Sequence, residues 1–112
     1  MARVLPTARA MEIALTGGRF DAATVLDWGL INRVVPDGTA LQAAIDLGSA
    51  IASNAPLAVV ASKRVIRESA DWRGEEAFQR QAIIADPVFE SDDANEGALA
   101  FLQKRAPSWT GR

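Results

Sequence analysis

Glycine and proline interrupt this chain of 112 residues at short intervals, and between them apolar side chains recur every three or four positions. Side chains at that spacing share one face of an α-helix, whereas a half-buried strand would need strict alternation. The most regular stripe includes small residues that allow close helix packing: Leu41, Ala44, Ile45, Gly48, Ile51 and Ala52. We therefore predict a mainly α chain of about six short helices, organised as one domain over residues 1–112.

Capping residues and helix breakers set the expected boundaries of these helices. The helices are predicted over residues 8–15, 22–28, 40–52, 56–69, 75–85 and 94–105. Gly17 and Gly29 can take the left-handed conformation that ends a helix, and Asp21 and Thr39 can cap helix N-termini. Pro56 suits a first helical turn, because its missing N–H would have no partner there.

Three further features define the second half of this pattern. We expect Pro87 to stop the fifth helix, because the residue before a proline disfavours helical angles. Asp93 and Glu96 have the spacing of a capping-box variant at the start of the sixth helix, which Pro107 ends. Residues 30–36 are rich in β-branched side chains and are expected to form one short extended segment.

Cysteine and histidine are both absent, which restricts the available chemistry. Without them the chain has no thiolate nucleophile, no disulfide and no ordinary zinc site. Lys and Arg total 12 against 14 Asp and Glu, with no long block of either sign. We therefore expect no metal and no nucleic-acid partner. No stretch approaches the roughly 18 apolar residues that span a bilayer, so we expect no membrane partner and a cytoplasmic location.

Four blocks of the sequence, in order, are similar to segments of one family. Residues 10–17 read AMEIALTG, residues 29–36 read GLINRVVP, residues 55–63 read APLAVVASK, and residues 91–107 contain EG, AF and KR before a proline. Together they resemble the enoyl-CoA hydratase/isomerases, the crotonase family. The resemblance covers essentially the whole chain and implies the C-terminal helical segment of the crotonase-like (ClpP/crotonase) fold.

The resemblance also implies which part of the family's machinery this segment contains. In the family, the oxyanion-hole N–H groups and the acid/base glutamates lie in an N-terminal ββα half, which has no counterpart in residues 1–112. Such groups stabilise the charge that develops in the reaction and move its protons. We therefore predict no catalytic residue in this chain, leave its status as an enzyme open, and expect no cofactor beyond the coenzyme A thioester, which is the substrate.

Ligand contact is implied by the resemblance at Phe101 and Lys104. In the family, a Phe and a Lys of the last helix approach the adenine and phosphate end of coenzyme A, often in the site of a neighbouring subunit. An aromatic face can lie against adenine, and an ammonium group can sit beside phosphate. The alternative for Phe101 is simple core packing on an apolar helix stripe with Ala98 and Leu102, and Lys104 has a non-binding alternative as well.

The remaining polar and aromatic candidates have plainer explanations. Arg105 is expected to interact with a helix C-terminus, and the acidic group Glu90, Asp92, Asp93 and Glu96 with a helix N-terminus rather than with a metal ion. A solvated surface is expected for Lys63, Arg64, Arg67, Glu12, Glu75 and Glu76. Packing or subunit contacts are expected for Trp28, Trp72 and Trp109.

Two functions remain open from the sequence. The first is hydration or isomerisation of enoyl-CoA thioesters in fatty-acid metabolism, with this chain supplying oligomer contacts of a trimer type and part of the coenzyme A site. The second is a non-catalytic helical interaction module from a truncated or split gene, which self-associates or docks onto a crotonase-family partner chain. The two differ in whether an acyl-CoA or enoyl-CoA ligand binds.

Overall fold

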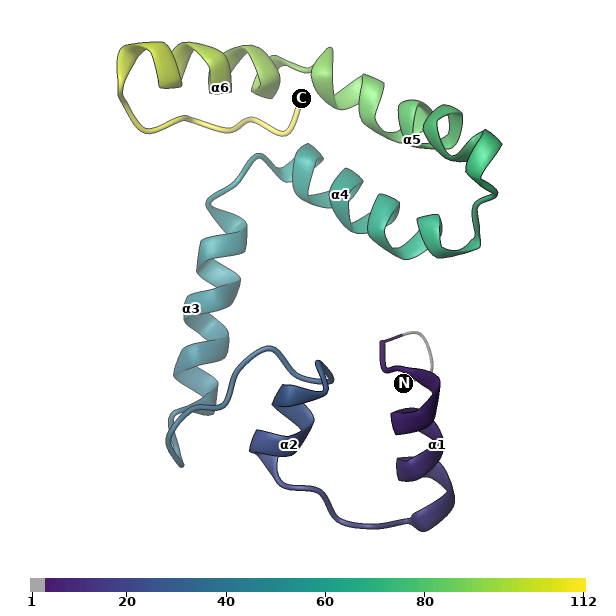
Figure 1. Cartoon of the computed structure of the whole chain (residues 1–112). Helices are drawn as coiled ribbons and strands as arrows, with labels where there is room; N and C mark the ends of the chain where they lie inside the picture. Colours follow the sequence, from purple (N-terminus) through teal and green to yellow (C-terminus); the bar gives the residue numbers. More distant parts are fainter. Residues whose placement is uncertain (1–3) are drawn as a thin grey trace. The chain divides into compact units, whose positions relative to one another are not determined.

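The computed structural model describes residues 4–112, and every regular element within them is helical. The α-helices are α1 (Thr7–Thr16), α2 (Ala22–Asp27), α3 (Ala40–Ala52), α4 (Pro56–Glu68), α5 (Gly74–Phe89) and α6 (Asp92–Gln103) (Figure 1). A 3₁₀ helix, η1 (Ser69–Asp71), follows α4. Within residues 4–112 there is no strand. The prediction of a mainly α chain with six helices is confirmed.

The chain forms two compact units, residues 1–44 and 45–112. Helices α1 and α2 belong to the first unit, and α4, η1, α5 and α6 belong to the second. Helix α3 begins in the first unit and continues in the second.

In the first unit, two predicted caps set the boundaries of α1 and α2. Gly17 has φ +60°, and its N–H donates to the Ile13 carbonyl at 3.3 Å, which closes α1. Oδ1 of Asp21 accepts a hydrogen bond from the Thr24 N–H at 2.7 Å, which caps α2. That bond stabilises the ionised carboxylate and so lowers the pKa of Asp21. Both sequence-based cap assignments are confirmed.

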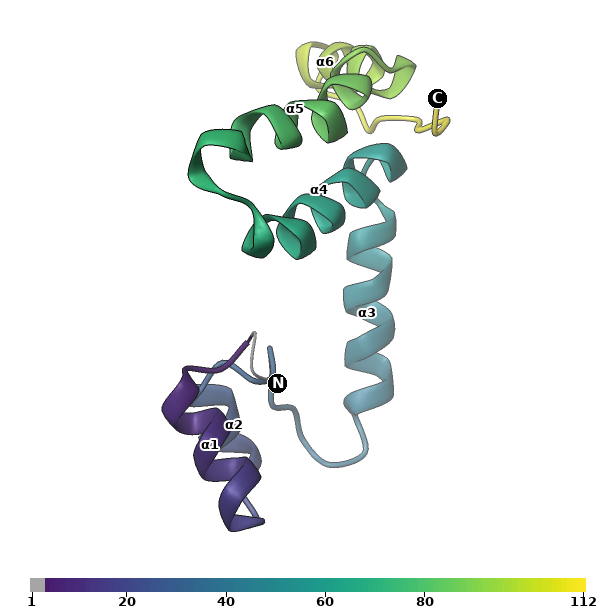
Figure 2. The same cartoon turned by 90° about the vertical axis from the view of Figure 1, so that its right-hand side faces the viewer.

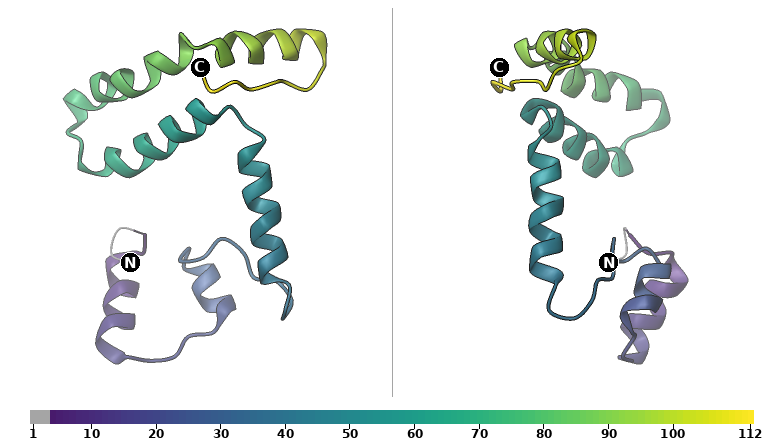
Figure 3. Two further views of the ribbon diagram at one scale, coloured as in Figure 1. Left: turned by 180° about the vertical axis from the view of Figure 1, so that it is seen from behind. Right: turned by 90° about the vertical axis from the view of Figure 1, so that its left-hand side faces the viewer.

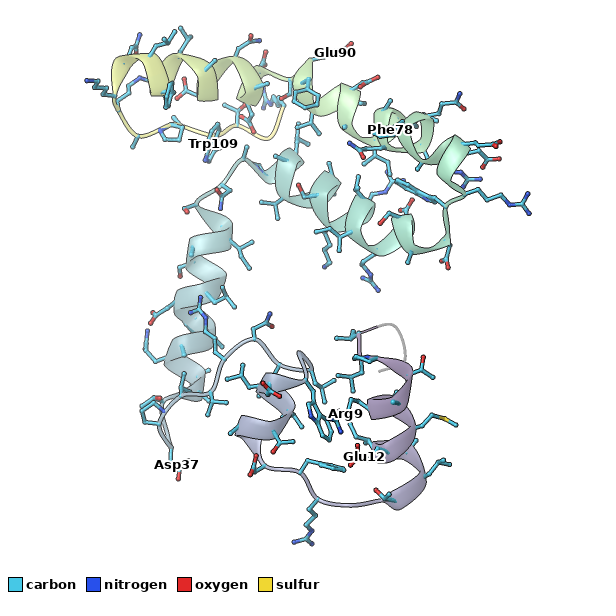
Figure 4. All side chains as sticks on the ribbon, in the orientation of Figure 1. Arg9, Glu12, Asp37, Phe78, Glu90 and Trp109 are labelled. Atoms are coloured by element: carbon cyan, nitrogen blue, oxygen red, sulfur yellow. The ribbon has the colours of Figure 1, made fainter. Side chains whose placement is uncertain are left out.

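Aromatic packing in this unit is centred on Trp28. The rings of Phe20 and Trp28 are tilted by 57° with their centroids 5.0 Å apart. The guanidinium carbon of Arg9 lies 4.7 Å from the centroid of the Trp28 ring, a cation–π distance. Glu12 forms an ion pair of 2.9 Å with the same arginine, one turn apart on α1 (Figure 4). Trp28 therefore packs within its own unit.

Residues 30–36, expected to be extended, contain no strand. Residues 30–32 form a bend, and residues 33–36 belong to no regular element. A strand is defined by its hydrogen bonds to a neighbouring strand, and residues 4–112 offer none. The β-branched composition alone is not sufficient to form one.

In the second unit, α4 and α5 lie side by side and are joined through η1 (Figures 1 and 2). Pro56 occupies the first turn of α4, as predicted. Ala58, Val59 and Val65 of α4 are half-buried, whereas Ile66, which the apolar stripe placed with them, is exposed. The two helices thus cover only part of each other's apolar surface.

The expectation that Pro87 ends the fifth helix is wrong. Helix α5 continues through Pro87 to Phe89. Proline cannot donate a backbone hydrogen bond, but the carbonyl just before it, of Asp86, still accepts from the Glu90 N–H at 3.1 Å. Because Pro87 lies in the last turn of the helix, little of the hydrogen-bond ladder remains for it to disrupt.

The cap of α6 also differs from its prediction. The hydroxyl oxygen of Ser91, not the carboxylate of Asp93, accepts from the Ala94 N–H, at 3.1 Å. The same hydroxyl donates to the Val88 carbonyl at 2.6 Å, which connects the end of α5 to the start of α6. The helix therefore starts at Asp92 and ends at Gln103, two residues earlier at each end than expected.

Few apolar side chains of the described residues are buried. Leu5, Ile84 and Ala100 are buried, whereas many larger ones are exposed, among them Leu15, Leu41, Phe78, Ile83, Phe89, Phe101 and Leu102. Monomeric soluble proteins expose single apolar side chains, but rarely so many large ones. Much of the apolar side-chain surface of the described residues is therefore exposed.

Residues 105–112 form a tail that runs back along α6 toward its first turn (Figures 1 and 3). Trp109 on this tail donates from Nε1 to the Ser53 carbonyl at 2.8 Å (Figure 4). A Cβ atom added to Gly97 of α6 would lie 3.3 Å from Cη2 of Trp109. Glycine at position 97 therefore allows the indole ring to approach the helix closely.

This close approach predicts different outcomes for two helical glycines. Gly48→Ala in α3 meets no atom within 4 Å, so it should stabilise the helix by about 1 kcal/mol. Gly97→Ala should lose that gain, because the new methyl group pushes Trp109 away from Ser53. Urea unfolding followed by circular dichroism measures both. Equal stabilisation by the two substitutions would show that the indole does not constrain position 97.

Candidate functional site

The C-terminal end of α6 has an unusual backbone at Lys104, one of the two residues predicted to contact a ligand. Lys104 adopts φ +53° and ψ +40°, the left-handed region, and it is the one non-glycine with positive φ in residues 4–112. The Lys104 N–H donates to the Phe101 carbonyl at 3.2 Å, and the Arg105 N–H donates to the Ala100 carbonyl at 3.0 Å. This pair of bonds is a Schellman motif, in which glycine is the usual left-handed residue. A lysine there costs roughly 1–2 kcal/mol.

Phe101, the other predicted contact residue, is 84% exposed on the last turn of α6. Its ring therefore does not pack into a core formed by residues 4–112. The Lys104 side chain is exposed as well, and it makes no hydrogen bond or ion pair with residues 4–112. An aromatic ring and an unpaired ammonium group thus lie three residues apart at one helix end.

Arg105, directly after Lys104, has a different role from the one expected. Its guanidinium group bonds both carboxylate oxygens of Glu96, at 2.6 and 2.8 Å. It also donates to Oε1 of Gln103 at 2.7 Å and to the Ala106 carbonyl at 3.1 Å. The prediction that this cation serves the helix C-terminus is wrong, because the bidentate carboxylate is the stronger partner. Of the N–H groups of Arg105, only the one on its backbone donates to a backbone carbonyl of α6.

Glu96 connects α6 to two positions of the tail. Besides the Arg105 guanidinium, its Oε1 accepts a hydrogen bond from the Ser108 N–H at 2.7 Å. These partners favour the ionised form, with Arg105 the larger cause, and lower the pKa of Glu96 from 4.5 to about 2. The same ion pair raises the pKa of Arg105. Glu96 therefore stays ionised well below neutral pH.

Asp93, one turn before Glu96, holds the end of the tail. Its side chain is only 2% exposed, and it accepts from the Thr110 N–H at 2.6 Å, the Thr110 hydroxyl at 3.1 Å and the Gly111 N–H at 2.9 Å. The Asp93 N–H donates to the Arg112 carbonyl at 3.1 Å. Hydrogen bonds from Thr110 are the main reason that the pKa of Asp93 is lowered. We call Asp93, Glu96, Arg105 and the tail bonds they make the carboxylate clasp.

The clasp was not predicted from the sequence. The spacing of Asp93 and Glu96 was interpreted as a helix cap, because such a cap is local and can be read from neighbouring residues. Their actual partners lie 9 to 18 residues further along the chain. Neighbouring residues give no signal that distinguishes the two arrangements, because a capping box uses an acidic residue at the same spacing.

The other charged candidates lie on exposed surfaces. Arg64 pairs with Glu68 at 3.0 Å along α4, and Arg80 pairs with Glu76 at 2.9 Å along α5. Exposed side chains are also found at Lys63, Arg67, Glu75 and Glu90. Asp92 is exposed and Asp93 is buried, and both lie in the first turn of α6, where negative charge is favourable. No hydrogen bond or ion pair within residues 4–112 joins the side chains of these residues to Phe101 or Lys104.

An apolar groove of about 390 Å³ runs between α4 and α5. Its walls come mainly from small and apolar side chains: Ala58, Ala61, Ser62, Val65, Ile66, Gln81, Ala85, Val88 and Phe89. Because it contains no charged side chain, the groove suits apolar contact rather than acid/base chemistry.

No single helix of residues 4–112 is both long and apolar enough to span a bilayer. Only the bent pair made of α3 and of α4 continued by η1 reaches that length and composition together.

A family model described as enoyl-CoA hydratase/isomerase matches residues 1–112. Enoyl-CoA hydratase EchA19 of Mycobacterium tuberculosis is 46% identical over 112 residues, which are 100% of this chain and 42% of that protein. Carnitinyl-CoA dehydratase of Escherichia coli K12 is 38% identical over 114 residues, covering 98% of this chain and 44% of that protein. The chain therefore spans less than half the length of these curated relatives.

Solved structures give the same result for the fold. An enoyl-CoA hydratase from Mycobacterium tuberculosis H37Rv matches 100% of this chain and 44% of its own, with a TM-score of 0.97 and 48% identity. Enoyl-CoA hydratase EchA1 from Mycobacterium marinum matches the same shares, with a TM-score of 0.96 and 46% identity. The helices of this chain are thus a segment of the fold that these hydratases adopt, as the resemblance implied.

The lowered pKa of Glu96 predicts a dependence of stability on pH. A carboxylate with a folded-state pKa below its unfolded value stabilises the fold above the unfolded pKa, and this contribution is lost as pH falls. For Glu96 the loss occurs between pH 4.5 and about 2. The free energy of unfolding, measured in urea across this range, should decrease less in Glu96→Gln than in the wild type.

The matched control is Glu75→Gln, which removes an exposed carboxylate that makes no hydrogen bond in residues 4–112. This variant should keep the wild-type pH dependence. Parallel curves for the wild type and Glu96→Gln would contradict the prediction.

Proposed function

The chain belongs to the enoyl-CoA hydratase/isomerase family, and we propose from this that it is the C-terminal helical region of a protein that acts on enoyl-CoA thioesters. The observation that carries the proposal is the family match over residues 1–112 together with relatives whose names specify coenzyme A thioesters. The proposed reaction is hydration of an enoyl-CoA or the related double-bond isomerisation in fatty-acid metabolism, in the cytoplasm.

In this proposal, the groups that act on the reacting atoms belong to the part of the relatives' length that residues 1–112 do not cover. The chain corresponds to 42–44% of its relatives, and its ionised groups are either paired or dispersed over exposed helix surfaces. Proton transfer to or from a thioester needs a positioned acid or base beside the reacting carbon. We therefore assign no catalytic residue to this chain.

Its proposed ligand contact is the exposed end of α6. Phe101 offers an aromatic face and Lys104 an unpaired ammonium group, and coenzyme A carries both an adenine ring and phosphate groups. Stacking on the ring and charge-assisted bonding to phosphate are the interactions that these two side chains can provide. The left-handed backbone of Lys104 supports this assignment, since strained residues tend to be retained where the side chain is used.

We further propose that the exposed apolar side chains form contacts with other protein surfaces, in a homo-oligomer of the trimer type or with a crotonase-family partner chain. The support is the large number of exposed apolar side chains on α4, α5 and α6. The same observation favours the second candidate function, a non-catalytic helical module that self-associates. Coenzyme A binding distinguishes the two, because only the first requires it.

The first test is catalytic. The purified 112-residue chain should not hydrate crotonyl-CoA above the uncatalysed rate, because it provides no oxyanion hole or acid/base pair. The loss of absorbance at the enoyl thioester band measures the reaction. Turnover that copurifies with the chain through two independent columns would refute the proposal that the catalytic groups lie outside the region that this chain covers.

The second test uses the backbone of Lys104. Lys104→Gly should raise the free energy of unfolding by about 1 kcal/mol, because glycine has no penalty in the left-handed region. It should also weaken coenzyme A binding by about tenfold or more, because a charge-assisted bond is lost. Urea unfolding and isothermal titration calorimetry measure the two effects.

Lys104→Gln is the matched control, since it removes the charge but keeps the side-chain constraint on the backbone. It should weaken binding without the gain in stability. If Lys104→Gly binds coenzyme A as tightly as the wild type, Lys104 does not contact the ligand.

A further inference from the structure

We infer that Glu96 is a positioning residue, which orients Lys104 through its ion pair with Arg105. The inference rests on the proposed function in one respect, namely that the Lys104 ammonium contacts an anionic ligand. Its structural part, that Glu96 fixes the backbone at Lys104, stands independently of any ligand.

The geometry that carries the inference is the way in which Arg105 is held. Its backbone N–H donates to the Ala100 carbonyl at 3.0 Å, and its guanidinium group bonds both oxygens of Glu96, at 2.6 and 2.8 Å. Both anchors belong to α6, where Glu96 and Ala100 are four residues, or about one helical turn, apart. Arg105 is therefore fixed by its main chain and its side chain at once.

Lys104 lies between the last helical residue and this fixed arginine. Its left-handed conformation is one that lysine adopts only when the surrounding structure enforces it. Gln103 is held by the helix on one side and Arg105 by Glu96 on the other, so the Lys104 backbone has few other conformations open to it. The direction in which its side chain leaves the turn is fixed with it.

The two consecutive cations thus have separate tasks. The Arg105 guanidinium bonds Glu96, Gln103 and Ala106, which together occupy four of its five N–H donors. The Lys104 ammonium makes no such bond in the described chain. An anion at this turn would therefore be met by lysine, whereas arginine serves to hold the turn.

The remainder of the clasp supports the same turn from further away. The Ser108 N–H donates to Glu96 at 2.7 Å, and Asp93 holds Thr110 and Gly111 at the other end of the tail. The tail is thus attached at two points one helical turn apart. Because Asp93 makes no contact with Arg105 in this set of bonds, it anchors the tail without acting directly on Lys104.

The test compares Glu96→Gln with the control Glu75→Gln in two measurements on the whole chain. In Glu96→Gln, amide hydrogen exchange should accelerate at least about tenfold more at Arg105 than at Ile84 in α5, because losing a charge-assisted pair opens the turn locally beyond any change in global stability. Equal acceleration at both amides would mean general destabilisation, and unchanged exchange at Arg105 would mean that Glu96 does not hold the turn. Either result overturns the inference.

The second measurement is a double-mutant cycle on coenzyme A affinity, determined by isothermal titration calorimetry. Glu96→Gln should weaken binding several-fold in the wild-type background and have no further effect once Lys104→Gly is present, because it acts through Lys104. Additive effects would overturn the inference while leaving the proposed function in place. If the wild-type chain does not bind coenzyme A, the proposed ligand contact fails, and the role of Glu96 in ligand positioning fails with it.

Discussion

The end of this chain depends on two carboxylates that bond backbone and side-chain donors of a returning tail. Asp93 is nearly fully buried and its carboxylate bonds Thr110 and Gly111 near the end of the chain, whereas Glu96 forms a bidentate pair with Arg105. A buried carboxylate is favourable only when such donors replace its hydration. Because the tail supplies them, the position of residues 105–112 and the state of these two acids are inseparable. The bonds of these two acids to the tail connect the last helix, its final turn and the tail segment that contains Trp109.

The exposed apolar side chains place a second constraint on the molecule. A chain of this length buries a smaller share of its surface than a larger domain does, and here the buried apolar residues are just Leu5, Ile84 and Ala100 among those described. The clasp compensates locally, because polar bonds to a tail stabilise α6 where apolar packing is sparse. It does not cover α4 and α5, whose shared groove is open and apolar. The polar clasp therefore orders the tail, whereas the helix pair leaves apolar surface exposed.

Local signals in the sequence were sufficient for most of the helices. Gly17, Asp21 and Pro56 each affect the backbone only within a few residues, so their effect on helix ends could be predicted from adjacent residues. Pro87 could not, because whether a proline ends a helix depends on how many turns follow it. The clasp could not either, since its bonds join residues far apart in sequence and the folding back of the tail leaves no periodic pattern. The family resemblance implied ligand contact at Phe101 and Lys104. The left-handed backbone that distinguishes Lys104 has no signal in the sequence and is a finding of the structure.

That backbone gives a physical argument about why a lysine stands where glycine would be more stable. Local strain of this kind is tolerated only when neighbouring bonds enforce it, and the Schellman pair together with the Glu96–Arg105 ion pair provides such enforcement. A residue that served only to end the helix would gain from replacement by glycine. In the proposed function, ligand binding offsets this backbone cost, since an exposed ammonium three residues from an exposed phenyl ring is suited to an anionic ligand with an aromatic group. Stability and binding are then set against each other at a single residue.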